Sequence, residues 1–205
     1  MRNFFQTTNW PQRHDKLHVY VLPDASGLEY AERFRDALTE YPAVSAMPRQ
    51  YLHFTVQMIE RFLHEVSEER ITQLVSALDE AVRNLSPIEL ELTTPSVHES
   101  HVRLDGVGPA TGFFELVTRV RSAIISVLGD DAVKPLGPGW GPHVSLGYGI
   151  ADGENEPLAR ALEQVAANVE PARVRFDAVH LLSVSQHPDE GTFGWDSLAV
   201  IKLRA

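Results

Sequence analysis

The chain has 205 residues, of which 43% are hydrophobic, and it contains no cysteine, which excludes disulfides and thiolate metal sites. This length and composition fit one domain, or two small equivalent lobes, with a sizeable core. The formal net charge of −10 at pH 7 argues against long nucleic acid as a ligand, although solubility explains the charge equally well. No apolar run approaches a membrane span and the first residues lack a signal-peptide pattern, so we expect a cytoplasmic protein without a membrane partner.

The first half of the chain is predicted to begin with an irregular arm, followed by alternating strands and helices. Residues 1–16 contain few periodic apolar residues and form the arm, whereas residues 17–205 form a single domain. Leu17–Leu22 alternates as a strand does, and Leu28–Tyr41 has the apolar spacing of a helix that stops before a proline. Leu52–Gln57 is the next strand-like run.

A second helix is predicted to begin after Ser67, whose hydroxyl can cap the first turn. Glu68 and Glu69 follow it, where the helix dipole favours negative charge. The apolar stripe of this helix consists of Ile71, Leu74, Val75, Leu78 and Val82.

The second half repeats the alternation. Ile88–Thr93 and His101–Leu104 are strand-like, and Thr111–Leu128 is an amphipathic helix that ends at a glycine. A loop rich in Gly and Pro, Pro135–Pro142, leads into a strand over Pro142–Tyr148.

The C-terminal part is predicted to add one helix and two strands. The helix covers Pro157–Val169, and the strands cover Val174–Ser185 and Trp195–Leu203, joined by a turn at residues 188–191. Periodicity alone indicates an α/β or α+β protein with mixed sheets.

Two His-x-Thr/Ser triplets, one in each half, are the most informative feature of the sequence. Alternation along a strand places His53 and Thr55 on one face, and His143 and Ser145 likewise share a face. The residues between and around them are apolar and can face a core. Two such strands set side by side would direct two imidazoles and two hydroxyls into one cleft. Hydroxyls can donate to phosphoryl oxygens, and imidazoles can exchange protons with the attacking and leaving oxygens of a phosphate ester.

At these triplets the chain resembles the 2H phosphoesterase superfamily, which includes 2′-5′ RNA ligase-like proteins, cyclic phosphodiesterases and tRNA-splicing phosphodiesterases. The resemblance rests on the triplets, their separation and the order of strands and helices, and it spans most of the chain after about Lys16. It implies an α+β fold with two pseudo-two-fold related lobes, each an antiparallel sheet with outer helices, around a central cleft. A third triplet, at residues 98–100, has a charged middle residue in a polar stretch and is excluded.

The resemblance also implies a hydrolase that opens a 2′,3′-cyclic phosphate or cleaves a 2′-5′ diester at a nucleotide or RNA end, without metal or cofactor. In the family, the first histidine is usually the proton donor to the leaving oxygen, and the second is the base that activates water. Carried over, these roles fall to His53 and His143, and they exchange when the reaction runs toward ester formation. Thr55 and Ser145 would hold the phosphate.

The sequence departs from the family pattern near the second triplet. Ser145 stands where threonine is common, but the hydroxyl is retained. Many relatives place a basic residue close to this triplet, whereas Gly, Pro and Tyr flank it here. Another cation would have to meet the phosphate charge: Arg103, Lys134 and Lys202 are candidates, although each is more often an ordinary surface charge.

Three aromatic residues are candidates for substrate binding: Tyr20, Trp140 and Tyr148. Tyr20 or Trp140 could stack on a base, a contact that tolerates any base. Alternatively, Tyr20 covers the core and Trp140 fixes its loop. Gly147 would share a face with the second triplet and leave room for a ligand, or it marks a bulge in the strand.

The remaining strand histidines, His18, His98, His101 and His180, are expected to be structural. A metal site built from His98, Glu99 and His101 has little support, because adjacent side chains in a strand point to opposite faces. The sequence also lacks a phosphate-cradling loop followed by Lys-Ser/Thr, so nothing indicates triphosphate hydrolysis or an ATP-dependent ligase.

Two functions follow from these observations. The first is a metal-independent phosphodiesterase that acts on a small phosphate ester, a nucleotide or an RNA terminus. The second is a related module that binds a nucleotide or RNA terminus without turnover. The intact histidine pair favours the enzyme, because binding alone needs no acid and base. We expect a monomer and no long duplex nucleic acid as partner.

Overall fold

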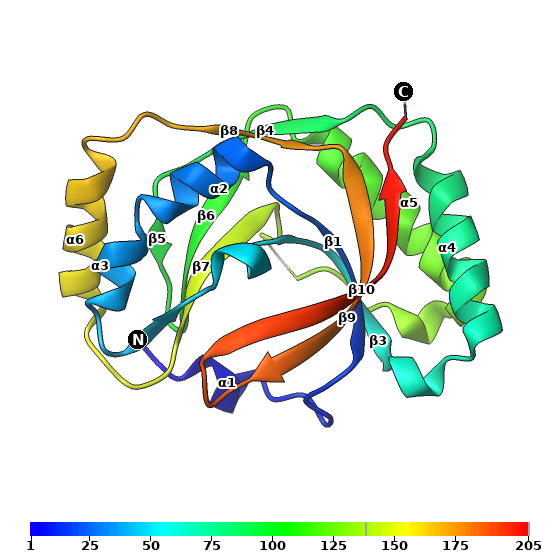
Figure 1. The fold of residues 1–205 in the computed structure, drawn as a ribbon, viewed down its shortest axis with the longest axis horizontal. Coiled ribbons are helices and arrows are strands. Elements are labelled where there is room, and N and C mark those ends of the chain that lie inside the picture. Colours follow the sequence, from blue (N-terminus) through cyan, green and yellow to red (C-terminus); the bar gives the residue numbers. More distant parts are fainter. Residues whose placement is uncertain (138, 205) are drawn as a thin grey trace.

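Eight antiparallel strands follow one path through the described part of the molecule, two short strands pair beside this path, and helices cover the strands on the outside (Figure 1). The computed structural model describes residues 1–137 and 139–204. The strand order is β10-β9-β1-β3-β7-β6-β4-β8, with β2 paired to β7 and β5 paired to β6. The strands are β1 (Lys16–Val21), β2 (Val44–Ala46), β3 (Phe54–Phe62), β4 (Ile88–Leu92), β5 (Ser96–Val97), β6 (His101–Val107), β7 (His143–Gly149), β8 (Arg173–Phe176), β9 (Ala178–His187) and β10 (Thr192–Lys202).

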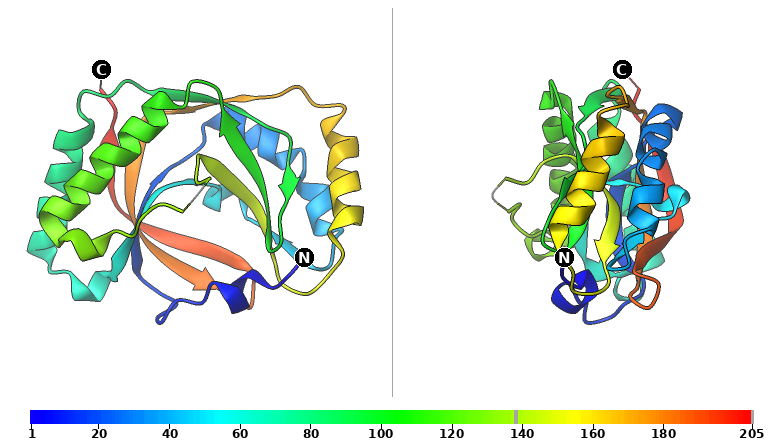
Figure 2. Two further views of the ribbon diagram at one scale, coloured as in Figure 1. Left: turned by 180° about the vertical axis from the view of Figure 1, so that it is seen from behind. Right: turned by 90° about the vertical axis from the view of Figure 1, so that its left-hand side faces the viewer.

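The helices divide the strands into two lobes (Figures 1 and 2). Strands β10, β9, β1 and β3 form the first lobe and carry α4 and α5, whereas β7, β6, β4 and β8 form the second lobe with α2, α3 and α6. The helices are α1 (Phe4–Thr7), α2 (Ala25–Glu32), α3 (Arg35–Thr39), α4 (Glu68–Val82), α5 (Thr111–Leu128) and α6 (Asn155–Ala166), with single 3₁₀ turns at Arg49–Tyr51, Leu63–Glu65 and Asp130–Ala132. The α+β fold expected from the resemblance, with antiparallel sheets and outer helices, is thus confirmed.

Each lobe contains segments from both halves of the chain. Helix α5 from the second half packs beside α4 in the first lobe, and α2 from the first half packs on β8 in the second lobe. Strand β4 follows α4 in sequence but pairs with β6 and β8, so the chain crosses between lobes after α4. The two lobes therefore interlock.

Local signals for two helices agree with the structure. The Ser67 hydroxyl accepts a hydrogen bond from the Arg70 amide at 3.3 Å and caps α4, whose Leu74, Leu78 and Val82 are fully buried. Helix α5 has the bounds that the sequence predicts, and Gly129 follows it with a φ of 94°. That positive φ suits glycine, so the chain can turn sharply there.

The structure corrects two predicted elements. The helix predicted over Leu28–Tyr41 is two helices, α2 and α3, because the amides of Arg33 and Phe34 bond to oxygens three residues back and tighten the turn. The strand predicted over Val174–Ser185 is also two, β8 and β9, which end and begin on either side of Asp177 and pair in different lobes. The other predicted strands and helices are present with bounds shifted by a few residues, and the predicted Pro135–Pro142 loop includes Pro138, which lies outside the described residues.

The N-terminal arm lies against the body of the molecule. Arg2 donates its amide to the Glu99 oxygen at 2.6 Å, and the Asn3 side chain donates to the Ile150 oxygen at 2.7 Å. Phe5 and Trp10 are buried in an aromatic cluster with Phe193. No helix in residues 1–137 and 139–204 combines the length and hydropathy needed to span a bilayer.

Candidate active site

The two triplets meet at the junction of the lobes. Phe54 of β3 pairs with Val144 of β7 in antiparallel register, and this is the pair that joins the two strands. These are the middle residues of the triplets, and both are buried on the core side. Extending the register by one residue in each direction places His53 beside Ser145 and Thr55 beside His143. The triplets thus form one four-residue cluster around a local pseudo-two-fold axis.

Both cluster histidines are oriented by the same backbone contact. Nδ1 of His53 lies 2.9 Å from the Tyr51 oxygen, and Nδ1 of His143 lies 2.9 Å from the Gly141 oxygen. A carbonyl oxygen can only accept, so each Nδ1 carries the hydrogen and Nε2 is the free nitrogen. Each Nε2 can therefore accept a proton when its ring is neutral and donate one when its ring is charged.

His53 lies in an aromatic enclosure. Its ring stacks on Tyr20 with centroids 4.0 Å apart and planes 12° apart, and Trp195 meets it edge-on at 5.2 Å. Burial lowers the pKa of His53 to about 4, because the charged ring loses hydration, and the neighbouring His143 lowers it further. His53 is therefore neutral at pH 7.

His143 faces charged neighbours on β6. Asp105 lies opposite His143 in the sheet, Arg103 lies opposite Ser145, and these two charged groups form an ion pair with Nε 2.9 Å from the carboxylate. Burial lowers the pKa of His143, the hydrogen bond to Gly141 opposes that shift, Arg103 lowers the pKa and Asp105 raises it. Of the three cations considered from the sequence, Arg103 is thus the cross-strand neighbour of a triplet.

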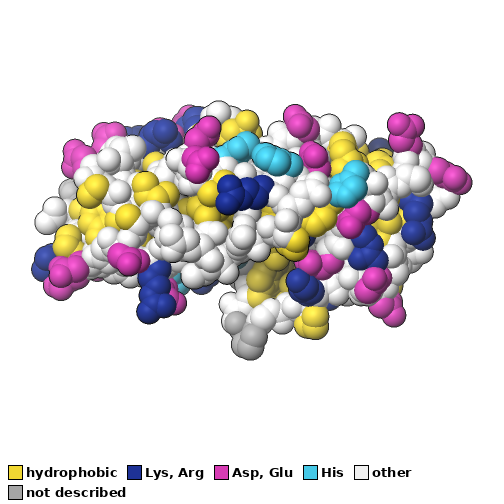
Figure 3. Space-filling model, turned by 90° about the horizontal axis from the view of Figure 1, so that it is seen from below, with side chains coloured by type: hydrophobic (Ala, Val, Ile, Leu, Met, Phe, Trp, Pro, Cys, Tyr) yellow, Lys and Arg dark blue, Asp and Glu magenta, His cyan; other side chains and the backbone are white. Residues whose placement is uncertain are grey.

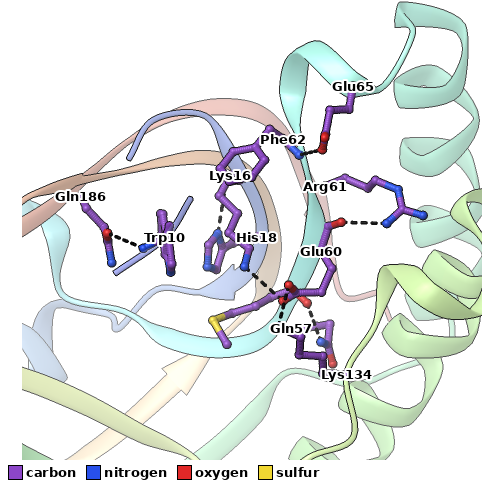
Figure 4. Close-up of polar contacts among 11 residues, drawn as sticks. Trp10, Lys16, His18, Gln57, Glu60, Arg61, Phe62, Glu65, Lys134 and Gln186 are labelled. Atoms are coloured by element: carbon purple, nitrogen blue, oxygen red, sulfur yellow. Dashed lines mark hydrogen bonds and ion pairs between the residues drawn. The ribbon is translucent and has the colours of Figure 1, made fainter. Parts of the chain in front are cut away.

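The other two cations are engaged elsewhere. The Lys202 ammonium lies 3.1 Å from Asp177 on the outside of the first lobe. The Lys134 ammonium lies 2.9 Å from Glu60, whose other oxygen lies 3.1 Å from the buried Lys16 (Figure 4). Lys134, Thr55 and Trp140 line a hollow of about 120 Å³, and Thr55 and Trp140 also line a larger cleft that contains both triplets.

Two phenols accompany the hydroxyls of the triplets. Tyr20 lies opposite Thr55 between β1 and β3. Burial raises the pKa of Tyr20 well above its usual value, and a hydrogen bond with the Thr55 side chain opposes that shift. Burial also raises the pKa of Tyr148 to about 12, and a hydrogen bond with the Ser145 side chain opposes that shift. Both phenols therefore keep their hydrogens at neutral pH and remain available as donors.

The four triplet residues and the three aromatic candidates all line one cleft of about 320 Å³, a size suited to a small ligand. Tyr20, Trp140 and Tyr148 thus lie with the four triplet residues. The full lining is Phe4, Thr8, Trp10, His18, Tyr20, His53, Thr55, Met58, His101, Trp140, His143, Ser145, Tyr148 and Phe193.

Each of the three aromatic candidates also has a structural contact. Tyr20 is 3% exposed and supports the His53 ring, so it both covers buried structure and faces the cleft. Tyr148 packs against Phe4 of the arm, with ring centroids 4.5 Å apart. Trp140 packs near Phe113 and Phe114 of α5, with centroids 6.0 and 6.3 Å away. These contacts place the Trp140 ring between α5 and the cleft.

Gly147 does not provide room for a ligand. A Cβ there would lie 2.8 Å from the Ser45 oxygen and 2.8 Å from a Val44 methyl, so the missing side chain makes room for β2. The register of β6 on β7 shifts between Val102 and Arg103. This bulge places Gly147 on the opposite face from His143 and Ser145. Of the two interpretations of Gly147, the structure therefore shows the bulge.

Sequence reasoning missed half of the cleft wall. His18 precedes Tyr20 by two residues in a strand, so the alternation that found Tyr20 also indicates His18. The arm residues Phe4, Thr8 and Trp10 gave no signal, because no periodicity marks an irregular segment that folds back onto a sheet.

The pair His98 and His101 departs from strand alternation. The two rings stack on one side of the β5–β6 turn with centroids 4.7 Å apart, so the turn overrides the alternation. The described residues contain no group of three or more His, Cys, Asp or Glu side chains placed to hold a metal ion.

Comparisons with known proteins give one matching family and several similar structures. The family model of the 2′-5′ RNA ligase superfamily matches residues 22–188. No curated protein matches the sequence. Among known structures, TT0787 of Thermus thermophilus is similar, with 15% identity, a TM-score of 0.71, and coverage of 92% of this chain and 98% of that one. E. coli LigT complexed with 3′-AMP is also similar, with 16% identity, a TM-score of 0.64, and coverage of 94% and 99%. At these identities the two structures show a shared fold.

Proposed function

Because the chain belongs to the 2′-5′ RNA ligase superfamily, we propose that it is a phosphodiesterase that hydrolyses a 2′,3′-cyclic phosphate or a 2′-5′ diester of a nucleotide or RNA end, with His53 and His143 as its acid/base pair. Family and fold support a phosphoesterase-type function. The observation that carries the finer proposal is the Phe54–Val144 pairing, which sets two imidazoles and two hydroxyls around one cleft.

The proposed reaction needs only groups that the cleft contains. The phosphate lies between the two Nε2 atoms, and Thr55 and Ser145 donate to its non-bridging oxygens. One imidazole takes a proton from water as the new P–O bond forms. The other gives its proton to the ribose oxygen as the old P–O bond breaks. No step requires a metal ion.

Burial lowers the pKa of both rings, and that of His53 falls to about 4, so the free cleft favours neutral imidazoles. Beside His143, Arg103 lowers the pKa and Asp105 raises it. A bound phosphate anion raises the pKa of both rings, and its effect is strongest on His53, the more enclosed ring. We therefore propose that substrate binding charges His53, which then protonates the leaving oxygen.

The surface of the protein favours a small ligand. Acidic and basic side chains are interspersed over the face seen in Figure 3, without a continuous basic stripe on that face. The net charge is −10. A long polyanion would gain little on this face, whereas a single phosphate needs only the few donors in the cleft.

A substrate panel tests the proposal directly. Purified protein is incubated with 2′,3′-cyclic nucleotides, 2′-5′ dinucleotides and a cyclic phosphate of ADP-ribose, each with and without EDTA. We expect at least one substrate to be hydrolysed, with EDTA lacking effect and the His53→Ala variant inactive. Nucleotide binding without turnover by wild-type protein would support the binding module instead. Activity that disappears with EDTA and returns with a divalent ion would refute metal-free catalysis.

A second experiment separates acid from base. A substrate whose leaving group is p-nitrophenol departs without protonation. The His53→Ala variant should therefore regain much of its activity on such a substrate, whereas His143→Ala should not. The opposite pattern would exchange the two roles.

A further inference from the structure

A second pair of histidines, His18 and His101, flanks the triplet histidines in the same cleft. His18 lies on β1 opposite Met58 of β3, and His101 lies on β6 opposite Tyr148 of β7. Met58 and Tyr148 occupy the third position after Thr55 and Ser145 respectively, so the two lobes place their extra histidines alike.

The equivalence extends to the irregularities of the strands. The β1–β3 register shifts between Val19 and Tyr20, and the β6–β7 register shifts between Val102 and Arg103. In both lobes the shift lies between the extra histidine and the residue opposite the triplet hydroxyl. The pseudo-two-fold that relates the triplets therefore also relates His18 to His101.

His18 presents one fixed nitrogen to the cleft. Its Nδ1 lies 3.1 Å from the Lys16 oxygen, a contact of the same kind as those that orient the triplet histidines. Figure 4 shows the His18 ring beside Trp10. Within the described residues its Nε2 has no hydrogen-bond partner, and Nε2 is not among the fully buried atoms that lack one. The side chain is 1% exposed, so Nε2 is open only to the cleft.

His18 is also held neutral. Burial lowers its pKa to about 3, and the nearby Lys16 and His53 act in the same direction. A neutral ring with its hydrogen on Nδ1 has only an acceptor at Nε2. Phosphate diester oxygens carry no hydrogens at neutral pH, so this nitrogen cannot serve the phosphate. It can accept from a hydroxyl or an amino group.

His101 differs in its contacts. Its Nδ1 is buried without a partner, and one face of its ring is covered by His98. Burial is the main cause that lowers the pKa of His101 to about 4, and His98, Arg103 and His143 act in the same direction. The carbonyl contact that fixes the hydrogen of His18 is absent from the described contacts of His101. His18 is thus the member of the pair with a defined hydrogen-bonding role.

We propose that His18 is a specificity-determining residue that accepts a hydrogen bond from a hydroxyl or amino group of the nucleoside attached to the phosphate. This inference rests on the proposed function, because it takes the bound molecule to be a nucleotide. It assigns the phosphate to the triplets and the organic part of the substrate to the wall that includes His18.

The test compares two probes on two variants. His18→Asn keeps a group near Nδ1 that can bond to the Lys16 oxygen but removes the acceptor at Nε2, whereas His18→Gln keeps an amide oxygen near Nε2. The probes are adenosine 3′-monophosphate and inorganic phosphate, measured by calorimetry. We expect His18→Asn to weaken nucleotide binding about 3- to 10-fold, the effect of one neutral hydrogen bond, and to leave phosphate binding within about twofold. His18→Gln should restore part of the loss.

A matched control and a kinetic readout separate recognition from structure. His180 lies on β9 opposite Tyr20 but does not line the cleft, so His180→Asn should change neither affinity. With an active substrate, His18→Asn should raise KM and leave kcat nearly unchanged. Nucleotides lacking single hydroxyl or amino groups then identify the donor, because wild type and variant should bind that analogue equally.

Defined results would overturn the proposal. Equal weakening of nucleotide and phosphate in both variants would make His18 a structural support of the triplets. Unchanged binding of both probes would exclude any contact. Failure of the proposed function is distinguishable, because it appears as wild-type protein that binds nucleotide with no turnover, or binds phosphate but no nucleotide.

Discussion

Buried neutral histidines should make this protein sensitive to mild acid. The pKa values of His18 and His53 are lowered to about 3 and about 4, whereas an unfolded histidine titrates near pH ~6.5. At pH ~5 the unfolded chain therefore binds about one proton at each of these positions that the native chain does not. The stability that the two neutral rings contribute is fully present above about pH 6.5. It is lost as the pH falls toward about 4 for His53 and about 3 for His18.

The size of the effect follows from the titration. Between about pH 6.5 and 5, each group lowers the free energy of unfolding by about 1.36 kcal/mol per pH unit, or about 2 kcal/mol over roughly 1.5 pH units. The two groups together therefore lower it by about 4 kcal/mol. This is a large share of the roughly 5–15 kcal/mol that holds a typical domain folded. Urea unfolding at pH 7.5, 6.0 and 5.0 measures the loss.

The variant His18→Gln isolates one of the two contributions. Carboxylates titrate alike in wild type and variant, so the difference between their unfolding free energies should shift by about 2 kcal/mol in favour of the variant between pH 7.5 and 5. Inorganic phosphate should stabilise wild-type protein more at pH 5.5 than at pH 7.5, because a bound anion favours charged rings. Parallel stability curves for the two proteins, or phosphate stabilisation that does not grow in acid, would refute the reasoning.

Three further outcomes concern the cleft. His53→Ala or His143→Ala should each lower kcat by about 10²–10⁴-fold in steady-state assays, and the double variant should lose far less than the product. Thr55→Ala or Ser145→Ala should cost roughly 1.5–3 kcal/mol in kcat/KM, and unchanged kinetics would show that the hydroxyls do not bind phosphate. Arg103→Met removes a charge that lowers the pKa of His143, so the acidic limb of the pH–rate profile should move to higher pH. An unmoved limb would exclude His143 as the base.

Local patterns in the sequence predicted the features that local physics determines. Alternation gave the shared face of each triplet, Ser67 gave the start of α4, and apolar spacing gave the bounds of α5. The resemblance supplied what alternation cannot, namely that the two triplets belong to one cleft.

The errors have a common physical origin in long-range pairing. The single strand predicted over Val174–Ser185 is interrupted at Asp177 because β8 and β9 pair with different strands. The local sequence pattern does not specify which strand is the partner. Gly147 was open to two interpretations because β2, the strand that needs its space, is only three residues long. The position of the arm beside the cleft depends on contacts between residues about a hundred or more positions apart.

The exchange of segments between lobes makes each half of the chain depend on the other. A half-length chain with one triplet would carry β4 without the β6 and β8 with which it pairs, and β1 without β9. Such a chain could complete its sheets only by associating with a second copy, and the symmetric solution would bring the two triplets together at the dimer axis. A single chain that contains both halves has the same two-histidine cleft, and the residues on its two sides can differ. Tyr20 lies beside one triplet hydroxyl and Arg103 beside the other.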